Sequence, residues 1–160
     1  MKPLKIIPIS PSYNESIAEL IRSVLVELGV PKVGTAYEDK ALEALSDYYS
    51  KENEAYFLLL NDEKLVGGAG IGIADEFNFV AELQKMYFLP EVRGKGWGEL
   101  MMKHCLDFAK EKSYKQVYIE TLPTMKAAQK LYQKFGFRYI DYRIGNTGHY
   151  SCDVWMLKDL

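Results

Sequence analysis

The sequence predicts a mixed α/β fold with the element order β-α-α-β-β-β-α-β-α-β-β. Apolar stripes at the helical period alternate along the chain with short strand-like apolar runs, and turn residues separate them. The 160 residues are 48% hydrophobic and 13% aromatic, which is enough to build a real core. No repeat, low-complexity tract or linker divides them, so we expect one domain over residues 1–160.

Each element is supported by its own pattern. Apolar runs of strand length predict seven strands, near residues 4–9, 55–60, 65–73, 79–89, 116–121, 137–143 and 150–158. Stripes of period 3.6 predict four helices, over about 15–28, 38–50, 97–112 and 124–135. The second of these helices has the weaker stripe. The last two strands are expected to pair in antiparallel around a turn at 145–148.

The charge and composition exclude several classes of partner. Net charge is −2 with both signs interspersed, so nothing indicates binding to nucleic acid or to an anionic membrane. No apolar run approaches the length of a membrane span. Residues 1–8 lack the pattern of a signal peptide, and two cysteines make no disulfide framework, so we expect a cytoplasmic protein. The sequence leaves a homodimer open.

A glycine-rich loop directly before a predicted helix is the strongest functional signal. It reads Arg93, Gly94, Lys95, Gly96, Trp97 and Gly98. Glycines let backbone N–H groups approach an anion, and the start of a helix adds unpaired N–H groups and a positive dipole end. The loop is therefore predicted to bind a phosphate or pyrophosphate.

Two common phosphate motifs fit this loop poorly. A P-loop is excluded, because no Gly-Lys-Ser/Thr follows at the required spacing. The glycines are also spaced G-x-G-x-G, whereas a dinucleotide fingerprint has G-x-G-x-x-G. Glu120 lies about twenty residues further on, where such a fold places a ribose-binding carboxylate, so a dehydrogenase remains a weaker alternative.

The pattern Arg93-x-x-Gly96-x-Gly98 resembles the pyrophosphate loop of the GCN5-related N-acetyltransferases (GNAT superfamily). A second segment, 128–137, resembles the family's A-x-x-L-Y-x-x-x-G-F motif and follows at the expected distance. The two motifs lie in the right order within about 79–142. One departure is Met125, which stands where the family often has Asn.

This resemblance implies a GNAT fold. Such a fold has a mixed, mostly antiparallel sheet of about seven strands, a splay between the central strands, and about four flanking helices. Acetyl-CoA would enter the splay and pair with strand backbone, as in β-augmentation. The resemblance assigns that backbone to Met86, Tyr87 and Phe88, and the pyrophosphate to the glycine loop.

The chemistry requires a group that removes a proton from the amine, because an alkyl amine with a pKa near ~10 is mostly protonated at neutral pH. Glu82 is the predicted base, since a carboxylate in an apolar strand is unfavourable to bury unless it is paired or functional. An ion pair with Lys85 or Lys115 is the structural alternative. Glu120, near a strand's C-terminal end, is the alternative base or a group that orients the amine.

Tyr132 matches the family's donor position, which implies hydrogen bonding to the departing thiolate; otherwise it is a core residue of a helix stripe. His149 is a candidate substrate contact, with turn stabilisation as the alternative. The pattern His149-x-x-Cys152 supplies too few ligands for a metal site, so no metal is expected. Cys105 lies on a buried stripe and is expected to be core.

Together these features predict an N-acetyltransferase that moves an acetyl group from acetyl-CoA to a primary amine of a small molecule. Direct attack in a ternary complex is preferred over an acyl-enzyme. The alternative from another class is a non-catalytic acyl-CoA-binding sensor module, which would keep the glycine loop but would not depend on Tyr132 or a carboxylate.

Overall fold

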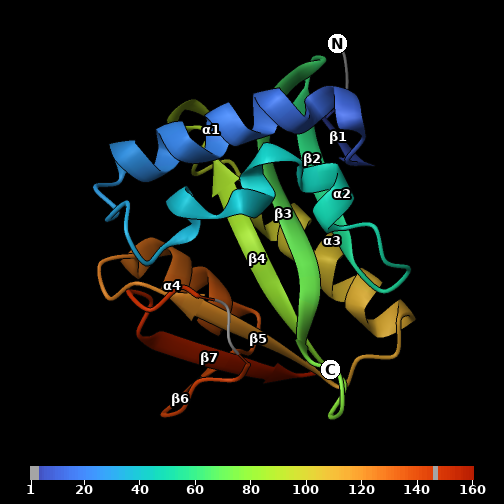
Figure 1. Cartoon of the computed structure of the whole chain (residues 1–160), viewed down its shortest axis with the longest axis vertical. Helices are drawn as coiled ribbons and strands as arrows, with labels where there is room; N and C mark the ends of the chain where they lie inside the picture. The colour runs from blue at the N-terminus through green and yellow to red at the C-terminus, as the bar shows by residue number, and fades with distance from the viewer. Residues whose placement is uncertain (1–3, 146–147) are drawn as a thin grey trace.

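The computed structural model describes residues 4–145 and 148–160, which form a seven-stranded sheet in the order β1-β2-β3-β4-β5-β7-β6 (Figure 1). The strands are Leu4–Pro8 (β1), Ala55–Asn61 (β2), Lys64–Asp75 (β3), Val80–Phe88 (β4), Gln116–Thr121 (β5), Arg138–Ile140 (β6) and Val154–Asp159 (β7). The helices are Asn14–Glu27 (α1), Leu45–Tyr48 (α2), Trp97–Glu111 (α3) and Lys126–Lys134 (α4). Within the described residues, no helix is long and apolar enough to cross a membrane.

The sheet is mostly antiparallel, and its one parallel pairing opens the molecule. β4 and β5 pair only over Val80–Glu82 and Gln116–Tyr118. β4 then continues to Phe88 and β5 to Thr121 without further pairing, so the two strands diverge toward α4 (Figure 1). The predicted splay between the central strands is therefore confirmed.

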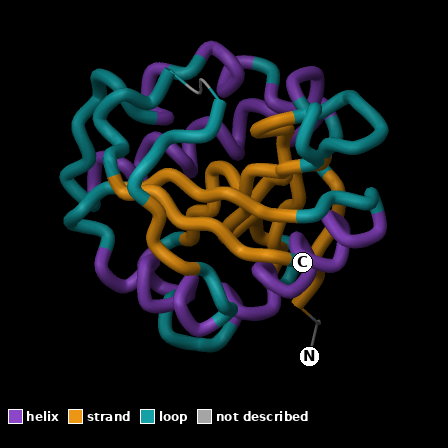
Figure 2. Tube along the Cα trace, turned by 90° about the horizontal axis from the view of Figure 1, so that it is seen from below, coloured by secondary structure: helices purple, strands orange, loops and turns teal. Residues whose placement is uncertain are grey.

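Helices cover both faces of the sheet (Figure 2). On one face, α3 and residues of α4 pack in a core that includes Leu59, Ile71, Met101 and Cys105, all fully buried. On the other face, α1 packs in a second core. The wide apolar stripe of each long helix thus fixes its place on the sheet.

The predicted helix over 38–50 is wrong. This segment forms a 3-10 turn at Lys40–Glu43 and the single-turn helix α2. Its two fully buried leucines fall in different elements, Leu42 in the 3-10 turn and Leu45 at the start of α2. The backbone N–H of Ser46 also donates to the side chain of Asn14 at 2.9 Å, which takes it away from a regular helix.

The two final strands are shorter than predicted. The segment 137–143 keeps only β6, and β7 begins at Val154. Between them the guanidinium of Arg143 donates to the carbonyls of His149 and Cys152, at 3.2 and 3.0 Å, and so takes up backbone groups of the intervening loop. Of the predicted turn at 145–148, residues 146–147 lie outside the described part of the chain.

Candidate active site

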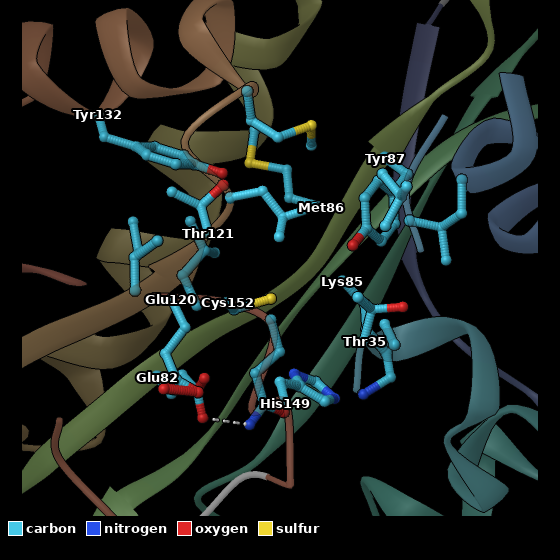
Figure 3. Close-up of a pocket in the computed structure, with 18 residues that line it drawn as sticks. Thr35, Glu82, Lys85, Met86, Tyr87, Glu120, Thr121, Tyr132, His149 and Cys152 are labelled. Atoms are coloured by element: carbon cyan, nitrogen blue, oxygen red, sulfur yellow. Dashed lines mark hydrogen bonds between the residues drawn. The ribbon is translucent and has the colours of Figure 1, made fainter. Parts of the chain in front are cut away.

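Two adjoining cavities lie in the gap between β4 and β5. The larger, about 350 Å³, runs between the end of β4, the glycine loop and α4. The smaller, about 60 Å³, lies deeper, beside the middle of β4 and the end of β5 (Figure 3). Four residues line both cavities and mark their junction: Met86, Tyr87, Met125 and Tyr132.

The glycine loop is open toward solvent. Gly94 and Gly96 have φ angles of 75° and 81°, a left-handed backbone that glycine adopts without strain. Gly96 caps the start of α3, and among the described residues no side chain caps the first N–H groups of that helix. A Cβ at either glycine would meet nothing within 4 Å, so a ligand has room to approach the unpaired N–H groups.

Arg93 uses its guanidinium inside the protein. It donates to the Glu27 carboxylate at 2.7 Å and to the carbonyl of Phe88 at 2.9 and 3.1 Å. The side chain therefore fastens the loop to the end of α1 and to the end of β4. Lys95 lies over the ring of Trp97, with 5.3 Å between its Nζ and the ring centroid.

The three strand residues expected to meet the carrier differ in their backbone direction. The N–H of Leu89 donates to Val66 on β3 at 2.9 Å, and alternate residues of a strand point to opposite edges. The backbone of Phe88 thus points away from β3, whereas that of Tyr87, paired with Gly68, points toward it. Tyr87 lines the cavities with its ring, and Met86 lines both as well.

Tyr132 comes from α4 and stands at the junction of the two cavities (Figure 3). Its ring is 8% exposed and packs 6.0 Å from the ring of Phe137. Within the described residues its hydroxyl makes no protein hydrogen bond, which leaves it available to a ligand. Burial raises the pKa of Tyr132 to about 12, so the hydroxyl keeps its proton at neutral pH.

Glu82 lies on the wall of the smaller cavity and is 4% exposed. Burial raises the pKa of its carboxyl to about 7; a hydrogen bond from Gln84 opposes this rise, and the charge of Glu120 adds to it. The Gln84 amide donates to Glu82 at 2.8 Å and accepts from the hydroxyl of Tyr49 at 2.5 Å. Neither lysine considered from the sequence pairs with it: Lys85 bridges to Asp39, and Lys115 lies over the ring of Phe79.

Glu120 lines the same cavity, but its charge is compensated. The carboxylate is 3.1 Å from the guanidinium of Arg143 and accepts a hydrogen bond from the hydroxyl of Tyr118 at 3.0 Å. Its side chain is only 1% exposed. Within the described residues Glu82, by contrast, has no ion-pair partner, and burial raises its pKa to about 7.

A third cavity of about 80 Å³ extends the smaller one and shares Glu82, Gln84, Lys85 and His149 with it. Asp39 organises this end, since its Oδ2 lies 2.7 Å from His149 Nε2 and 3.0 Å from Lys85 Nζ. Burial disfavours the ionised Asp39, but these two partners outweigh it and hold the pKa of the carboxyl below its ordinary value.

The sequence did not single out Asp39, Gln84 or Arg143 for the site. Asp39 fell inside a predicted helix, and Gln84 and Arg143 carry no motif, so only their hydrogen bonds reveal them. Cys152 lines the smaller cavity, and burial raises the pKa of its thiol to about 12. Among the described residues, no group of His, Cys, Asp and Glu could hold a metal ion.

Comparison with known proteins identifies the class. The Acetyltransferase (GNAT) family model matches residues 19–137. The chain is 39% identical over 149 residues to an uncharacterized N-acetyltransferase of Escherichia coli K12, YjgM, covering 92% of this chain and 89% of that protein. A GNAT-family acetyltransferase from Staphylococcus aureus Mu50 matches with a TM-score of 0.83 at 23% identity, over 99% of both chains.

PaiA N-acetyltransferase from Thermoplasma acidophilum, solved in complex with coenzyme A, matches with a TM-score of 0.74 at 18% identity, over 99% of this chain and 100% of that one. These solved structures thus share the fold of this chain, a mixed sheet that opens beside a glycine loop. The chain belongs to the GNAT family of acetyltransferases and is an N-acetyltransferase.

Proposed function

We propose that residues 1–160 act as one domain that transfers the acetyl group of acetyl-CoA to the primary amine of a small molecule. The observation that carries this proposal is the junction at Met86, Tyr87, Met125 and Tyr132, where a long cavity from the glycine loop meets a small cavity lined by Glu82. The carrier and the acceptor would enter from opposite sides and meet there.

The larger cavity suits the carrier. Unpaired N–H groups at Gly96 and the start of α3 would hold the pyrophosphate, because helix N-termini attract anions. The pantetheine arm would lie beside β4, where the backbone of Phe88 points away from β3 and toward the gap. Arg93 would support this loop through Glu27 and Phe88 instead of contacting the phosphates.

Glu82 would act as the general base. With a pKa of about 7, its carboxyl is ionised in a substantial fraction of molecules at neutral pH. A free ammonium has a pKa near ~10, so proton transfer is unfavourable in water, but burial of the amine lowers that gap. The neutral amine then attacks the thioester carbonyl, and a C–N bond forms as the C–S bond breaks.

Tyr132 would stabilise the departing thiolate. Because its pKa of about 12 exceeds that of an ordinary thiol, near ~8.5, it donates a hydrogen bond and keeps its proton. The high pKa of Cys152 argues against an acyl-enzyme formed through this residue, because the thiolate is the nucleophile and little of it exists at neutral pH. Direct attack therefore fits the site better.

The acceptor would be small. The cavities of about 60 and 80 Å³ beside Glu82 are enclosed by the 34–39 segment and by the loop that carries His149. These segments are linked, since the N–H of Ser151 donates to the carbonyl of Gly34 at 3.0 Å. A bulky acceptor would have to break such contacts.

A panel of small amines mixed with acetyl-CoA tests this function, with thiol release and the mass of the product as readouts. At least one amine should gain an acetyl group. Tyr132→Phe should keep acetyl-CoA affinity and lower turnover about a hundredfold, because only the hydroxyl is lost. A protein that binds acetyl-CoA but transfers it to no amine would instead be the sensor module. Full activity in Tyr132→Phe would return this residue to the core.

A further inference from the structure

An irregularity in β4 redirects one side chain. Ala81 and Leu83 belong to the core beneath α3, while Glu82 and Gln84 face the cavities. Regular alternation would send residue 85 into the core. The register between β3 and β4 instead shifts between Gly68 and Gly70. Over this stretch β4 has one residue more than β3, which forms a β-bulge. Lys85 has a φ of 50° there, and its side chain joins Glu82 and Gln84 on the cavity wall.

The bulge holds Lys85 in an unfavourable backbone. A left-handed φ is uncommon for a residue with a Cβ, and such strain persists only where the surroundings fix it, often at functional sites. Here the hydroxyl of Tyr56 donates to the carbonyl of Lys85 at 2.8 Å. Bulges beside active sites commonly re-aim a side chain, and this one places a lysine where a core residue would otherwise lie.

The ammonium of Lys85 has more N–H donors than it has hydrogen-bonding partners within the described residues. Its side chain is 3% exposed, and its Nζ lies 3.0 Å from Asp39. An ammonium carries three donors, and within residues 4–145 and 148–160 Asp39 is its one hydrogen-bonding partner. A buried donor without a partner is unfavourable, so a polar ligand in the cavity would be stabilised here.

Two ion pairs at the cavity form within the protein and leave Glu82 outside them. Lys85 is paired with Asp39, and Arg143 with Glu120. The ammonium of a ligand would meet the ionised form of Glu82, and a carboxylate on the same ligand would meet the ammonium of Lys85, so neither charge of a zwitterion would be buried without a partner. Within the described residues Glu82 and Lys85 form no ion pair, so an ammonium and a carboxylate of one ligand can lie between them.

We propose that the acceptor is a small amino acid whose carboxylate binds Lys85 while its amine faces Glu82. His149, which also contacts Asp39, lines the same cavities from the opposite loop (Figure 3). The proposal rests on the proposed acetyl transfer and names the class of its substrate. The positive charge of Lys85 determines the specificity for the acceptor, and the bulge in β4 places that charge in the cavity.

The test compares isosteric acceptors that differ in one charge. L-Amino acids and their carboxamides are assayed in pairs with acetyl-CoA by thiol release. For the best acceptor, kcat/KM should exceed that of its amide at least about tenfold. Lys85→Met should lower kcat/KM for the acid about tenfold or more, mainly through KM, and change that for the amide less than about threefold.

Lys85→Gly is the second variant, because glycine relieves the left-handed backbone and keeps the fold if methionine does not. It should lose the same preference for the acid. Lys103→Met, at an exposed position on α3, is the control and should match the wild type. Equal rates for acids and amides, or an acid preference that survives both Lys85 variants, would overturn the carboxylate site.

A failure of the proposed acetyl transfer can be distinguished from a failure of the amino-acid site. If acetyl-CoA does not bind by calorimetry, acetyl transfer itself is rejected, and with it the substrate class. If acetyl-CoA binds and simple amines or amides are acetylated while no amino acid is, the transferase stands and only the amino-acid acceptor is wrong.

Discussion

The buried carboxyl of Glu82 is predicted to support activity but to lower the stability of the folded protein at neutral and alkaline pH. Its carboxyl has a folded-state pKa of about 7 against an ordinary value of 4.5, mainly because it is buried. The folded protein therefore keeps this proton over a pH range in which the unfolded chain has lost it. The stability that the proton confers is fully present below pH 4.5 and is lost as pH rises through about 7.

Glu82→Gln should for this reason separate the two properties. The shift of roughly 2.5 units, at 1.36 kcal/mol per unit, corresponds to about 3 kcal/mol. Glutamine cannot ionise, so the variant should gain up to that much stability over the wild type above pH 7 and none near pH 4.5. Denaturant unfolding at several pH values measures the difference.

The same variant should lose turnover, and the wild-type kcat/KM should fall as pH drops below about 7, because the base is then protonated. A variant whose stability advantage is equal at acidic and alkaline pH would show that Glu82 does not titrate near neutrality. If the variant is active and its kcat/KM falls at low pH as in the wild type, the base would instead be Glu120 or water.

At the scale of elements, strand β3 makes the space in which the site is built. A Cβ at Gly68 would lie 2.7 Å from the ring of Tyr56, and one at Gly70 would lie 2.9 Å from the ring of Tyr49. A Cβ at Gly72, which stands opposite Glu82, would lie 2.6 Å from Oε1 of Gln84. The glycines of this strand thus leave room for the side chains around Glu82, including Gln84, which donates to its carboxylate.

Gly72→Ala should disturb that orientation at little expense in stability, since only the flexible end of Gln84 must move. Glu82 would lose a donor that favours its ionised form, so its pKa should rise and the acid limb of kcat/KM should shift to higher pH. Tyr49→Phe should shift it in the same direction, because the amide of Gln84 loses its fixed orientation.

Tyr114→Phe is the matched control for Tyr49→Phe. It removes another tyrosine hydrogen bond, donated to the carbonyl of Asn53 at 2.9 Å, from a residue outside the three cavities of the site. Its acid limb should coincide with that of the wild type. A folded Gly72→Ala protein with an unshifted profile would show that Gln84 does not position Glu82.

The elements show what a sequence can and cannot predict. Long stripes, such as those of α1 and α3, fix both the helix and its buried face, because a wide apolar face must be covered. The segment 38–50 was predicted wrongly: its stripe is weak, its backbone leaves the helical region at Ala44, and the N–H of Ser46 donates to the side chain of Asn14. The loop motif predicted the phosphate end of the candidate site, and that role stays a prediction.

The residues at the acceptor end of the candidate site were harder to predict from the sequence. Glu82, Glu120 and His149 were selected from the sequence, and all three line the smaller cavity, although their roles stay predictions. Lys85 was considered only as an ion-pair partner of Glu82, although regular strand alternation would place it on the opposite face. A bulge depends on how two strands pair, and no local pattern specifies the left-handed φ of a lysine.

At the scale of the whole molecule, the splay leaves the sheet joined at its centre by three register pairs. Beyond them, β4 and β5 are held together by the core beneath α3, which takes residues from both strands, including Leu83 and Ile119. A ligand that fills the gap and bonds to strand backbone would add contacts that the free protein lacks. Such a ligand stabilises the fold by an amount that grows with the logarithm of the ratio of its free concentration to its Kd.

Acetyl-CoA should therefore raise the melting temperature. At a hundredfold excess over its Kd it should add about 2.7 kcal/mol, which for a chain of this size corresponds to an increase of about 5–11 °C. Hydrogen exchange should slow at Phe88 in β4 and at Ile119 to Thr121 in β5, where the strands diverge, and remain unchanged where β1 pairs with β2.

NADH is the control, because a dinucleotide fold would respond to it, and it should leave both measurements unaltered. Protection by NADH but not by acetyl-CoA would contradict the assignment of the gap to the acyl carrier. Stabilisation by acetyl-CoA without slower exchange at these strand ends would place the carrier elsewhere on the molecule.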